Sequence, residues 1–130
     1  MKPIHFSGKR KRAIARATLK EGKGVIRVNN KLLDVYQPEM CRMKIMEPLL
    51  LSGDAANKVN ITVRVEGGGQ VAQADAIRLA IGRCLVKLNP NLKKTFLDYD
   101  RTLLIADVRR KEPNKPNDSK ARAKRQFSKR

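Results

Sequence analysis

The 130-residue sequence has one histidine, no tryptophan, and aromatic residues at only 4% of its positions. Because His5 stands alone near the amino terminus, neither a Ser/His/Asp triad nor a histidine-based metal site can be assembled. Asp98 and Asp100 are close in sequence, but in so basic a chain we expect them to be ion-pair partners of nearby cations. Those cations are Lys93, Lys94 and Arg101. We therefore expect no enzymatic activity, no cofactor and no metal.

Long apolar runs and paired cysteines are also absent. Cys41 and Cys84 form no CxxC motif and fall in apolar, helix-like stretches, which indicates two reduced, buried thiols in a cytosolic protein. No window approaches the 18 apolar residues of a membrane span, and residues 1–20 lack the apolar run of a signal peptide. No segment pairs a basic stripe with bulky aromatic residues. We expect a cytoplasmic protein that binds no membrane.

Acidic residues are scarce, since 12 of them face 30 lysines and arginines, which leaves a net charge of +18. Residues 1–31 hold ten cations and one acid, residues 109–130 hold ten and two, and residues 32–108 hold ten and nine. Charge packed into two terminal segments repels itself unless phosphate opposes it. This distribution predicts a nucleic-acid-binding protein, and the few aromatic residues predict binding through backbone charge and shape rather than base stacking.

The last eleven residues, Lys120–Arg130, carry six cations, no anion and a single aromatic residue, Phe127. Such a segment lacks the apolar surface that would offset the entropy of ordering, so we expect an arm that a partner orders. Lysines and arginines that alternate with small residues suit a chain of phosphates. We divide the chain into a globular domain with a basic amino-terminal segment, residues 1–108, and an extended basic tail, residues 109–130.

Alternation of apolar and polar residues predicts the strands. Residues 10–28 read as a β-hairpin that turns at Glu21–Gly24, with a short strand at residues 32–35 after it. Residues 58–66 alternate without a fault, and residues 102–108 read as a last strand.

Helical spacing of apolar residues predicts two main helices. The first runs from Pro38 to about residue 51, where Ser52-Gly53 closes it, and Pro48 should kink or end it. The second runs over residues 70–88, with residues 91–97 as a short third. We expect the methionines of the first helix to fill the core. The apolar stripe of the second begins at Val71, and Arg78, Arg83 and Lys87 lie mostly off it.

Three glycines, Gly67, Gly68 and Gly69, separate the predicted strand 58–66 from the second helix. Backbone N–H groups at a helix start attract anions, so this loop could contact an RNA phosphate. The sequence matches neither GxGxxG nor a P-loop, and the glycines could equally serve a sharp turn and close packing.

Four motifs along the chain, taken together, resemble one known family, the small-subunit ribosomal proteins numbered nine. They are Gly8-Lys-Arg-Lys-Arg-Ala-Ile-Ala-Arg16, Val65-Glu-Gly-Gly-Gly-Gln70, Gln73-Ala-Asp-Ala-Ile-Arg78 and Gln126-Phe-Ser-Lys-Arg130. The resemblance covers nearly the whole chain. The linker over residues 111–119 departs from the bacterial pattern and looks more like an archaeal form.

The resemblance implies an α+β fold, with a mixed sheet of about four strands and two main helices, similar to the second domain of ribosomal protein five. It implies a place in the small-subunit head on the 3′ major domain of the rRNA, beside neighbouring head proteins. It also implies that the tail reaches the anticodon stem-loop of tRNA in the peptidyl site, through Ser128, Lys129 and Arg130.

The residues that we expect to bind rRNA are the basic ones of the two ends and the three glycines. They are Lys9, Arg10, Lys11, Arg12, Arg16, Gly67, Gly68, Gly69, Arg109, Arg110, Lys111, Lys120, Arg122, Lys124 and Arg125. The alternative is a free-standing DNA-binding architectural protein, although nothing resembles a recognition helix or an apolar wedge. An RNA-processing enzyme lacks its catalytic residues.

Overall fold

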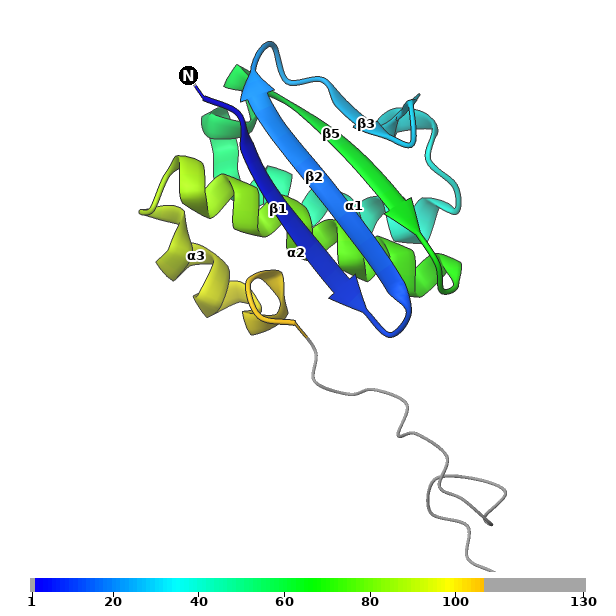
Figure 1. The fold of residues 1–130 in the computed structure, drawn as a ribbon. Helices are drawn as coiled ribbons and strands as arrows, with labels where there is room; N and C mark the ends of the chain where they lie inside the picture. Colours follow the sequence, from blue (N-terminus) through cyan, green and yellow to red (C-terminus); the bar gives the residue numbers. More distant parts are fainter. Residues whose placement is uncertain (1, 107–130) are drawn as a thin grey trace, which may run out of the picture.

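The structure, a computed structural model that describes residues 2–106, is one sheet with helices packed on one of its faces (Figure 1). The strands are β1 (Ile4–Arg10), β2 (Ala13–Glu21), β3 (Ile26–Val28), β4 (Lys31–Leu32) and β5 (Val59–Glu66). The helices are α1 (Glu39–Ser52), α2 (Gln70–Leu88) and α3 (Leu92–Tyr99). Short 3-10 turns lie at η1 (Leu33–Val35), η2 (Gly53–Lys58) and η3 (Arg101–Leu103). The expected α+β fold is confirmed, with five strands rather than about four.

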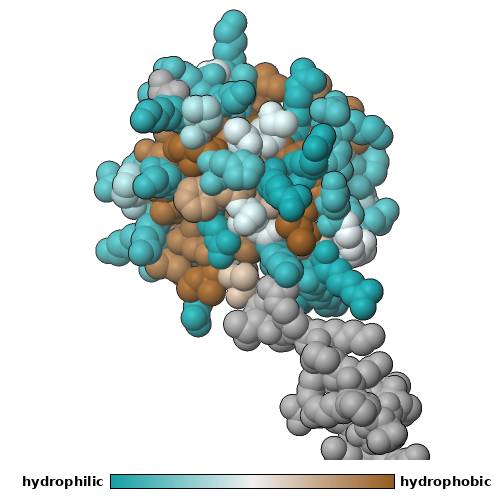
Figure 2. Space-filling model, viewed as in Figure 1, coloured by the Kyte–Doolittle hydropathy of each residue, from teal (hydrophilic) through white to brown (hydrophobic). Residues whose placement is uncertain are grey.

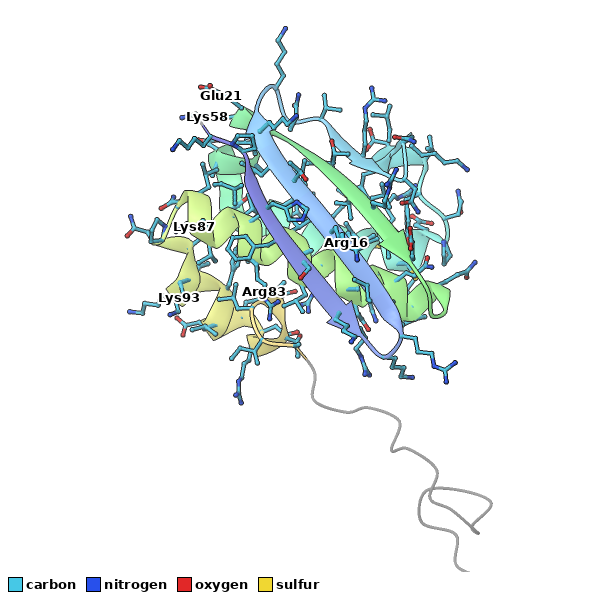
Figure 3. All side chains as sticks on the ribbon, in the orientation of Figure 1. Arg16, Glu21, Lys58, Arg83, Lys87 and Lys93 are labelled. Carbon is cyan, nitrogen blue, oxygen red and sulfur yellow. The ribbon has the colours of Figure 1, made fainter. Side chains whose placement is uncertain are left out.

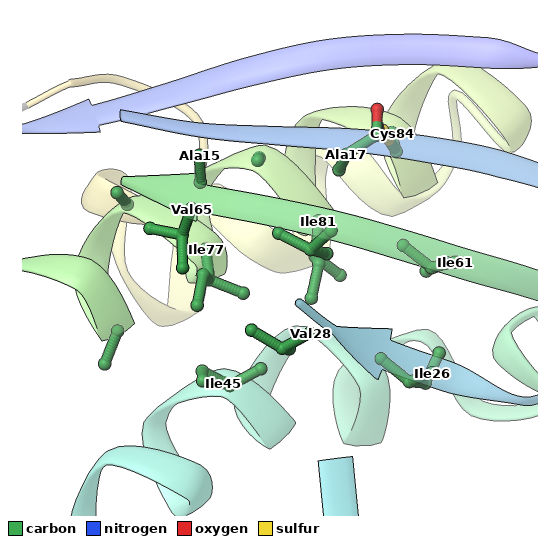
Figure 4. Close-up of a cluster of buried hydrophobic side chains, with 14 of the residues drawn as sticks. Ala15, Ala17, Ile26, Val28, Ile45, Ile61, Val65, Ile77, Ile81 and Cys84 are labelled. Carbon is green, nitrogen blue, oxygen red and sulfur yellow. Dashed lines mark hydrogen bonds between the residues drawn. The ribbon is translucent and has the colours of Figure 1, made fainter. Parts of the chain in front are cut away.

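The sheet is mixed and has the order β1-β2-β5-β3-β4, in which only β3 and β5 run parallel. The two long central strands alternate strictly. Ala13, Ala15, Ala17 and Leu19 of β2 have no exposed surface and pack with the valines and isoleucine of β5 against α2. Figure 4 shows this core, where Val28 of β3 and Ile45 of α1 close the far side. Period-two patterning therefore determines which face is covered.

The predicted hairpin over residues 10–28 is wrong in its pairing. Strand β2 pairs with β1 across a turn at Lys11 and Arg12, and β5 lies between β2 and β3. The chain is held away from β2 because the Asn60 side-chain oxygen of β5 accepts hydrogen bonds from the amides of Lys23 and Val25, at 2.9 and 3.0 Å. Strand β3 then reaches β5 as the first half of a parallel βαβ unit whose crossover contains α1.

The strand predicted over residues 102–108 is also wrong within the described part. Its first residues form η3 and a turn, because the Asp100 carboxylate accepts hydrogen bonds from the amide and hydroxyl of Thr102, at 3.0 and 2.8 Å. Leu103 is fully buried, and its carbonyl lies so close to Gly82 that a Cβ there would be 2.5 Å from the oxygen. Residues 107 and 108 lie outside the described residues.

Helix α2 has the predicted bounds, and α1 ends at Ser52 and is capped by Gly53, whose φ of 60° suits glycine. Pro48 lies inside α1 without ending it, and it is buried. The expectation that the methionines fill the core is wrong for Met40 and Met43, whose side chains are exposed, as is Val71 at the start of α2. Helix α1 packs mainly against α2 and buries only a narrow stripe, so its other side faces solvent.

Both cysteines are free and buried, as expected. Burial raises the pKa of the Cys84 thiol to about 11, despite a hydrogen bond with the backbone of Phe6. None of the described helices is both long and apolar enough to cross a membrane.

Candidate nucleic-acid interface

The face of the sheet that no helix covers carries the outward residues of β1, β2, β5 and β3 (Figure 1). Hydrophilic side chains make up most of this side of the molecule, with apolar ones in patches between them (Figure 2). We call it the basic sheet face. Its cations are Lys9, Arg16, Lys20, Arg27 and Arg64, all exposed.

Two arginines stand directly opposite each other at the centre of this face. The register pairs Arg16 of β2 with Arg64 of β5, and Ser7 of β1 completes the row. Figure 3 shows Arg16 on the open side of the sheet. Neither guanidinium group has a hydrogen bond or ion pair with any of residues 2–106. Like charges opposite each other destabilise a sheet, and an anion that bridged the two guanidinium groups would remove this repulsion.

The rows on either side add several hydrogen-bond donors and one acid. One row places His5, Thr18, Thr62 and Arg27 side by side, with 3.0 Å between His5 Nδ1 and the Thr18 hydroxyl oxygen. The other contains Lys9, Ile14 and Glu66, the one acid of these three rows. A surface of hydroxyls and cations on a rigid sheet suits the phosphates and sugars of a nucleic acid.

The predicted cation cluster at residues 9–12 is divided by the strand geometry. Lys9 points to the basic sheet face, whereas Arg10 points toward α2, where its Nε lies 3.9 Å from a carboxylate oxygen of Asp75. Lys11 and Arg12 form the β1–β2 turn, with Lys11 at a φ of 53°. Only part of the cluster therefore faces the same way as Arg16.

The glycine loop packs against this turn. A Cβ on Gly67 would lie 2.6 Å from the Arg12 carbonyl oxygen, and both Gly67 and Gly68 have positive φ, so the packing interpretation is confirmed for them. The Gln73 side-chain amide donates to the Gly67 carbonyl at 3.0 Å and holds the loop on α2. Gly69 is exposed at the start of α2, where no side chain caps the helix. Phosphate contact at this loop stays a prediction.

Arg78 belongs to the interior, contrary to its expected place off the apolar stripe. Its side chain is 9% exposed, and its guanidinium donates to Glu47 of α1, Asp100 and Thr102, each with a contact of 2.9 Å. The expected pairing of Asp100 with nearby lysines or Arg101 is therefore wrong. Burial acts to raise the pKa of Asp100, but hydrogen bonds from Thr102 and Arg78 outweigh it and lower that pKa.

A cleft of about 460 Å³ lies beside Arg78, but its lining favours no single class of ligand. Its lining mixes cations with carboxylates, and those carboxylates already pair with Arg78, Arg10 or Lys44. Within residues 2–106, no group of three or more histidine, cysteine or acidic side chains could hold a metal ion.

Arg83 fixes the end of the described chain. Its Nε donates to the Leu104 carbonyl at 3.1 Å, and its Nη1 donates to the Ser7 carbonyl on the free edge of β1 at 3.0 Å. The segment that precedes residue 107 is therefore attached to the strand that borders the basic sheet face.

Ten predicted site residues lie outside the described residues and stay predictions. They are Arg109, Arg110, Lys111, Lys120, Arg122, Lys124, Arg125, Ser128, Lys129 and Arg130. The predicted site residues did not include Lys20, Arg27 and Arg64, which the structure places on the basic sheet face. The alternation of residues 58–66 carried the signal for Arg64, because it places this arginine on the face opposite the buried valines.

Comparison with known proteins gives matches over nearly the whole chain. A family model described as ribosomal protein S9/S16 matches residues 8–130. The small ribosomal subunit proteins uS9 of two strains of Methanococcus maripaludis are 50% identical over 132 residues, which cover 98% of this chain and 98% of each relative. The protein of the same name from Methanococcus vannielii is 48% identical over the same shares.

Proposed function

This chain belongs to the ribosomal protein S9/S16 family, and on that basis we propose how it acts in the small subunit. The family places it among the structural proteins of the small ribosomal subunit, which are not enzymes, and so in the cytoplasm with the ribosome. Its basic sheet face binds rRNA of the 3′ major domain in the subunit head. Its tail, residues 109–130, extends to tRNA in the peptidyl site. The relatives give no support to the DNA-binding alternative.

The single observation that carries rRNA binding is the unpaired row of Arg16 and Arg64. Each guanidinium can grip a phosphate with two hydrogen bonds, and a phosphate between them removes their mutual repulsion. Thr18 and Thr62 beside them offer hydroxyls to sugars and phosphates. None of these contacts reads a base, so the protein would recognise the fold of its rRNA rather than a sequence.

The tail proposal rests on the family resemblance and on charge. Arg130 offers a bidentate fork and Lys129 a compact charge, so two adjacent phosphates of an anticodon stem can be held without reading bases. A site that accepts every elongator tRNA needs contacts of this kind. Residues 120–125 supply four more cations for the rRNA along the way.

Competition during assembly tests the sheet-face proposal. The double variant Arg16→Gln/Arg64→Gln and a control, Lys87→Gln/Lys93→Gln, are each mixed with equal wild-type protein and with rRNA and the other small-subunit proteins. We expect the wild type to displace the sheet variant several-fold more than the control. Both pairs of substitutions remove the same charge, but only the sheet variant loses the two facing guanidinium groups. Equal incorporation of the two variants would contradict the proposal.

Removal of Lys129 and Arg130 tests the tail separately. We expect normal incorporation, and tRNA binding in the peptidyl site weakened by about 1.5–3 kcal/mol, the range for hydrogen bonds to charged groups. Unchanged tRNA dissociation from assembled subunits would refute the tail contact and leave the sheet-face proposal standing.

A further inference from the structure

A second surface has the opposite chemistry. A groove of about 450 Å³ runs between the β3–β4 segment, the second half of α1 and η2. Nine of its eleven lining residues are apolar or glycine, and the two polar ones are Asp34 and Asn57. We call it the apolar groove.

Its walls are exposed rather than closed over. Leu50 of α1 is 73% exposed, Leu32 of β4 is 45% exposed, and Val25 before β3 is 37% exposed. Ile26, Met46 and Leu49 form the floor, and they join the surface to the core. Clustered exposed apolar side chains around a concave surface are typical of an interaction site.

Charge excludes a nucleic acid from this groove. No lysine or arginine lines it, although the chain carries a net charge of +18. Asp34 is its one ionisable lining residue, and the Asp34 carboxylate has no ion pair or hydrogen bond with residues 2–106. Arg42 binds the Asp34 carbonyl instead, at 2.9 Å. A phosphate here would lose hydration, meet a negative charge and gain no donor.

The same charges argue against a second copy of this chain. Two molecules of +18 repel each other. A symmetric contact through the groove would also bring Asp34 toward its own copy. A fitting occupant carries an apolar side chain for the groove and a lysine or arginine for Asp34.

We infer that the apolar groove is a docking site for a segment of a neighbouring small-subunit protein, with an aliphatic or aromatic anchor and an adjacent cation. This rests on the proposed function, because that function puts the chain among other basic proteins. The anchor would cover Leu50, Leu32 and Val25, and the cation would pair with Asp34 at the rim. Aromatic and aliphatic anchors in such pockets contribute most of the binding energy of an interface.

Site-directed photocrosslinking in assembled subunits tests the inference. Leu50→Cys in the full chain is labelled with a benzophenone maleimide, and Thr62→Cys on the basic sheet face is labelled in the same way. The natural cysteines are buried, which keeps the label on the new thiol. Each labelled protein is assembled into small subunits, irradiated, and its products are identified by mass spectrometry and by ribonuclease digestion.

We expect position 50 to crosslink to a peptide of another small-subunit protein, and position 62 to crosslink to rRNA. Products at position 50 that contain only rRNA or another copy of this chain would overturn the inference. So would an absence of products there from subunits that contain the labelled protein. Failure of the rRNA product at position 62 would count against the sheet-face proposal alone, because position 50 is read independently.

A pair of exposed positions on one helix supplies the matched substitution test. Leu50→Gln alters the groove, whereas Met40→Gln changes a side chain of similar exposure, 75%, that does not line it. We expect Leu50→Gln to lower retention of the crosslinked neighbour several-fold during a salt wash, with no change in affinity for protein-free rRNA. Asp34→Asn should lower it less, and Met40→Gln not at all. Equal retention in the Leu50 and Met40 variants would contradict docking at the groove.

Discussion

Two consecutive residues of strand β3 lie on two different surfaces, one basic and one apolar. Arg27 lies on the basic sheet face, in the row of Thr18 and Thr62, whereas Ile26 lines the apolar groove. The basic sheet face holds five exposed cations and the groove holds none. Because strand residues alternate between faces, one short strand can border an rRNA surface and a protein surface at once. The difference shows that exposed cations of the described residues are concentrated on one of these two surfaces and absent from the other.

A similar contrast separates the buried Arg78, which holds two carboxylates, from the exposed arginines that we propose bind rRNA. The largest expected change in stability concerns Arg78. Arg78→Met leaves Glu47 and Asp100 without their shared cation. We expect a loss of about 3 kcal/mol in the free energy of unfolding, the low end for a broken buried pair, since both acids keep some solvent contact. Arg16→Met should not lower it, because this side chain is exposed and faces the like charge of Arg64. Urea unfolding of both variants measures this, and equal losses would remove the distinction.

Strand β1 offers a similar comparison between its inward and outward residues. Gly8 faces α2 so closely that a Cβ would lie 2.2 Å from the Ala76 carbonyl oxygen and 2.7 Å from the Ala80 nitrogen. Both neighbours are backbone atoms, so Gly8→Ala should destabilise the protein by about 1–3 kcal/mol, the usual range for overpacking. Ser7→Ala, on the open face, is the control. Equal unfolding midpoints for the two variants would show that β1 shifts freely.

On the basic sheet face we expect a smaller change, which is an increase in the free energy of unfolding. Arg64→Gln removes the like charge opposite Arg16, so the free energy of unfolding should rise by about 0.2–1 kcal/mol at low salt. Its affinity for small-subunit rRNA should fall at the same time, because glutamine cannot hold a phosphate as the guanidinium does. Parallel unfolding and filter-binding measurements test this. A decrease in stability together with the decrease in affinity would show that the arginines stabilise the fold.

The smallest expected effect is on acid stability. The pKa of Asp100 is lowered from its ordinary 3.8, so the stability that this carboxylate contributes is present above that value and is lost as the pH falls through the lowered one. Asp100→Asn should therefore be less stable at neutral pH and lose less stability below about pH 4. Unfolding midpoints between pH 7 and pH 2.5 measure it. Parallel curves for the variant and the wild type would contradict the assignment.

Sequence patterns sufficed where the signal is local. The alternation in β2 and β5 and the helical spacing in α2 gave correct elements, because each buries one continuous stripe. The hairpin failed because a contact distant in sequence decides it, and the last strand failed because a side chain only two residues away competes with the strand pattern. Asn60 holds the chain before β3, and Asp100 folds Thr102 into a turn.

The candidate binding surface was predictable from the sequence only in its charge, and not in the arrangement of its residues. Charge density marked the basic ends of the chain, yet only the register could place Arg64 beside Arg16 and turn Arg10 toward Asp75. The apolar groove had no sequence signal of its own. Leu50 and Leu32 are residues of a type that usually lies in a core. Leu50 is exposed because α1 buries only a narrow stripe, and Leu32 is exposed in β4 at the edge of the sheet.

The central claim is that the position of the charge, and not its amount, binds the rRNA. The salt dependence of rRNA affinity tests it for the full chain and for two triple variants of equal net charge. One is Arg16→Gln/Arg27→Gln/Arg64→Gln, and the other is Lys58→Gln/Lys87→Gln/Lys93→Gln, at positions away from the basic sheet face (Figure 3).

The slope of log affinity against log salt concentration falls by about 1 for every phosphate that a variant no longer binds. We expect the sheet-face triple variant to lower that slope by about 3, and the control triple variant to leave it near the wild-type value. Equal slopes for the two triple variants would contradict the account, because net charge alone would then explain the binding.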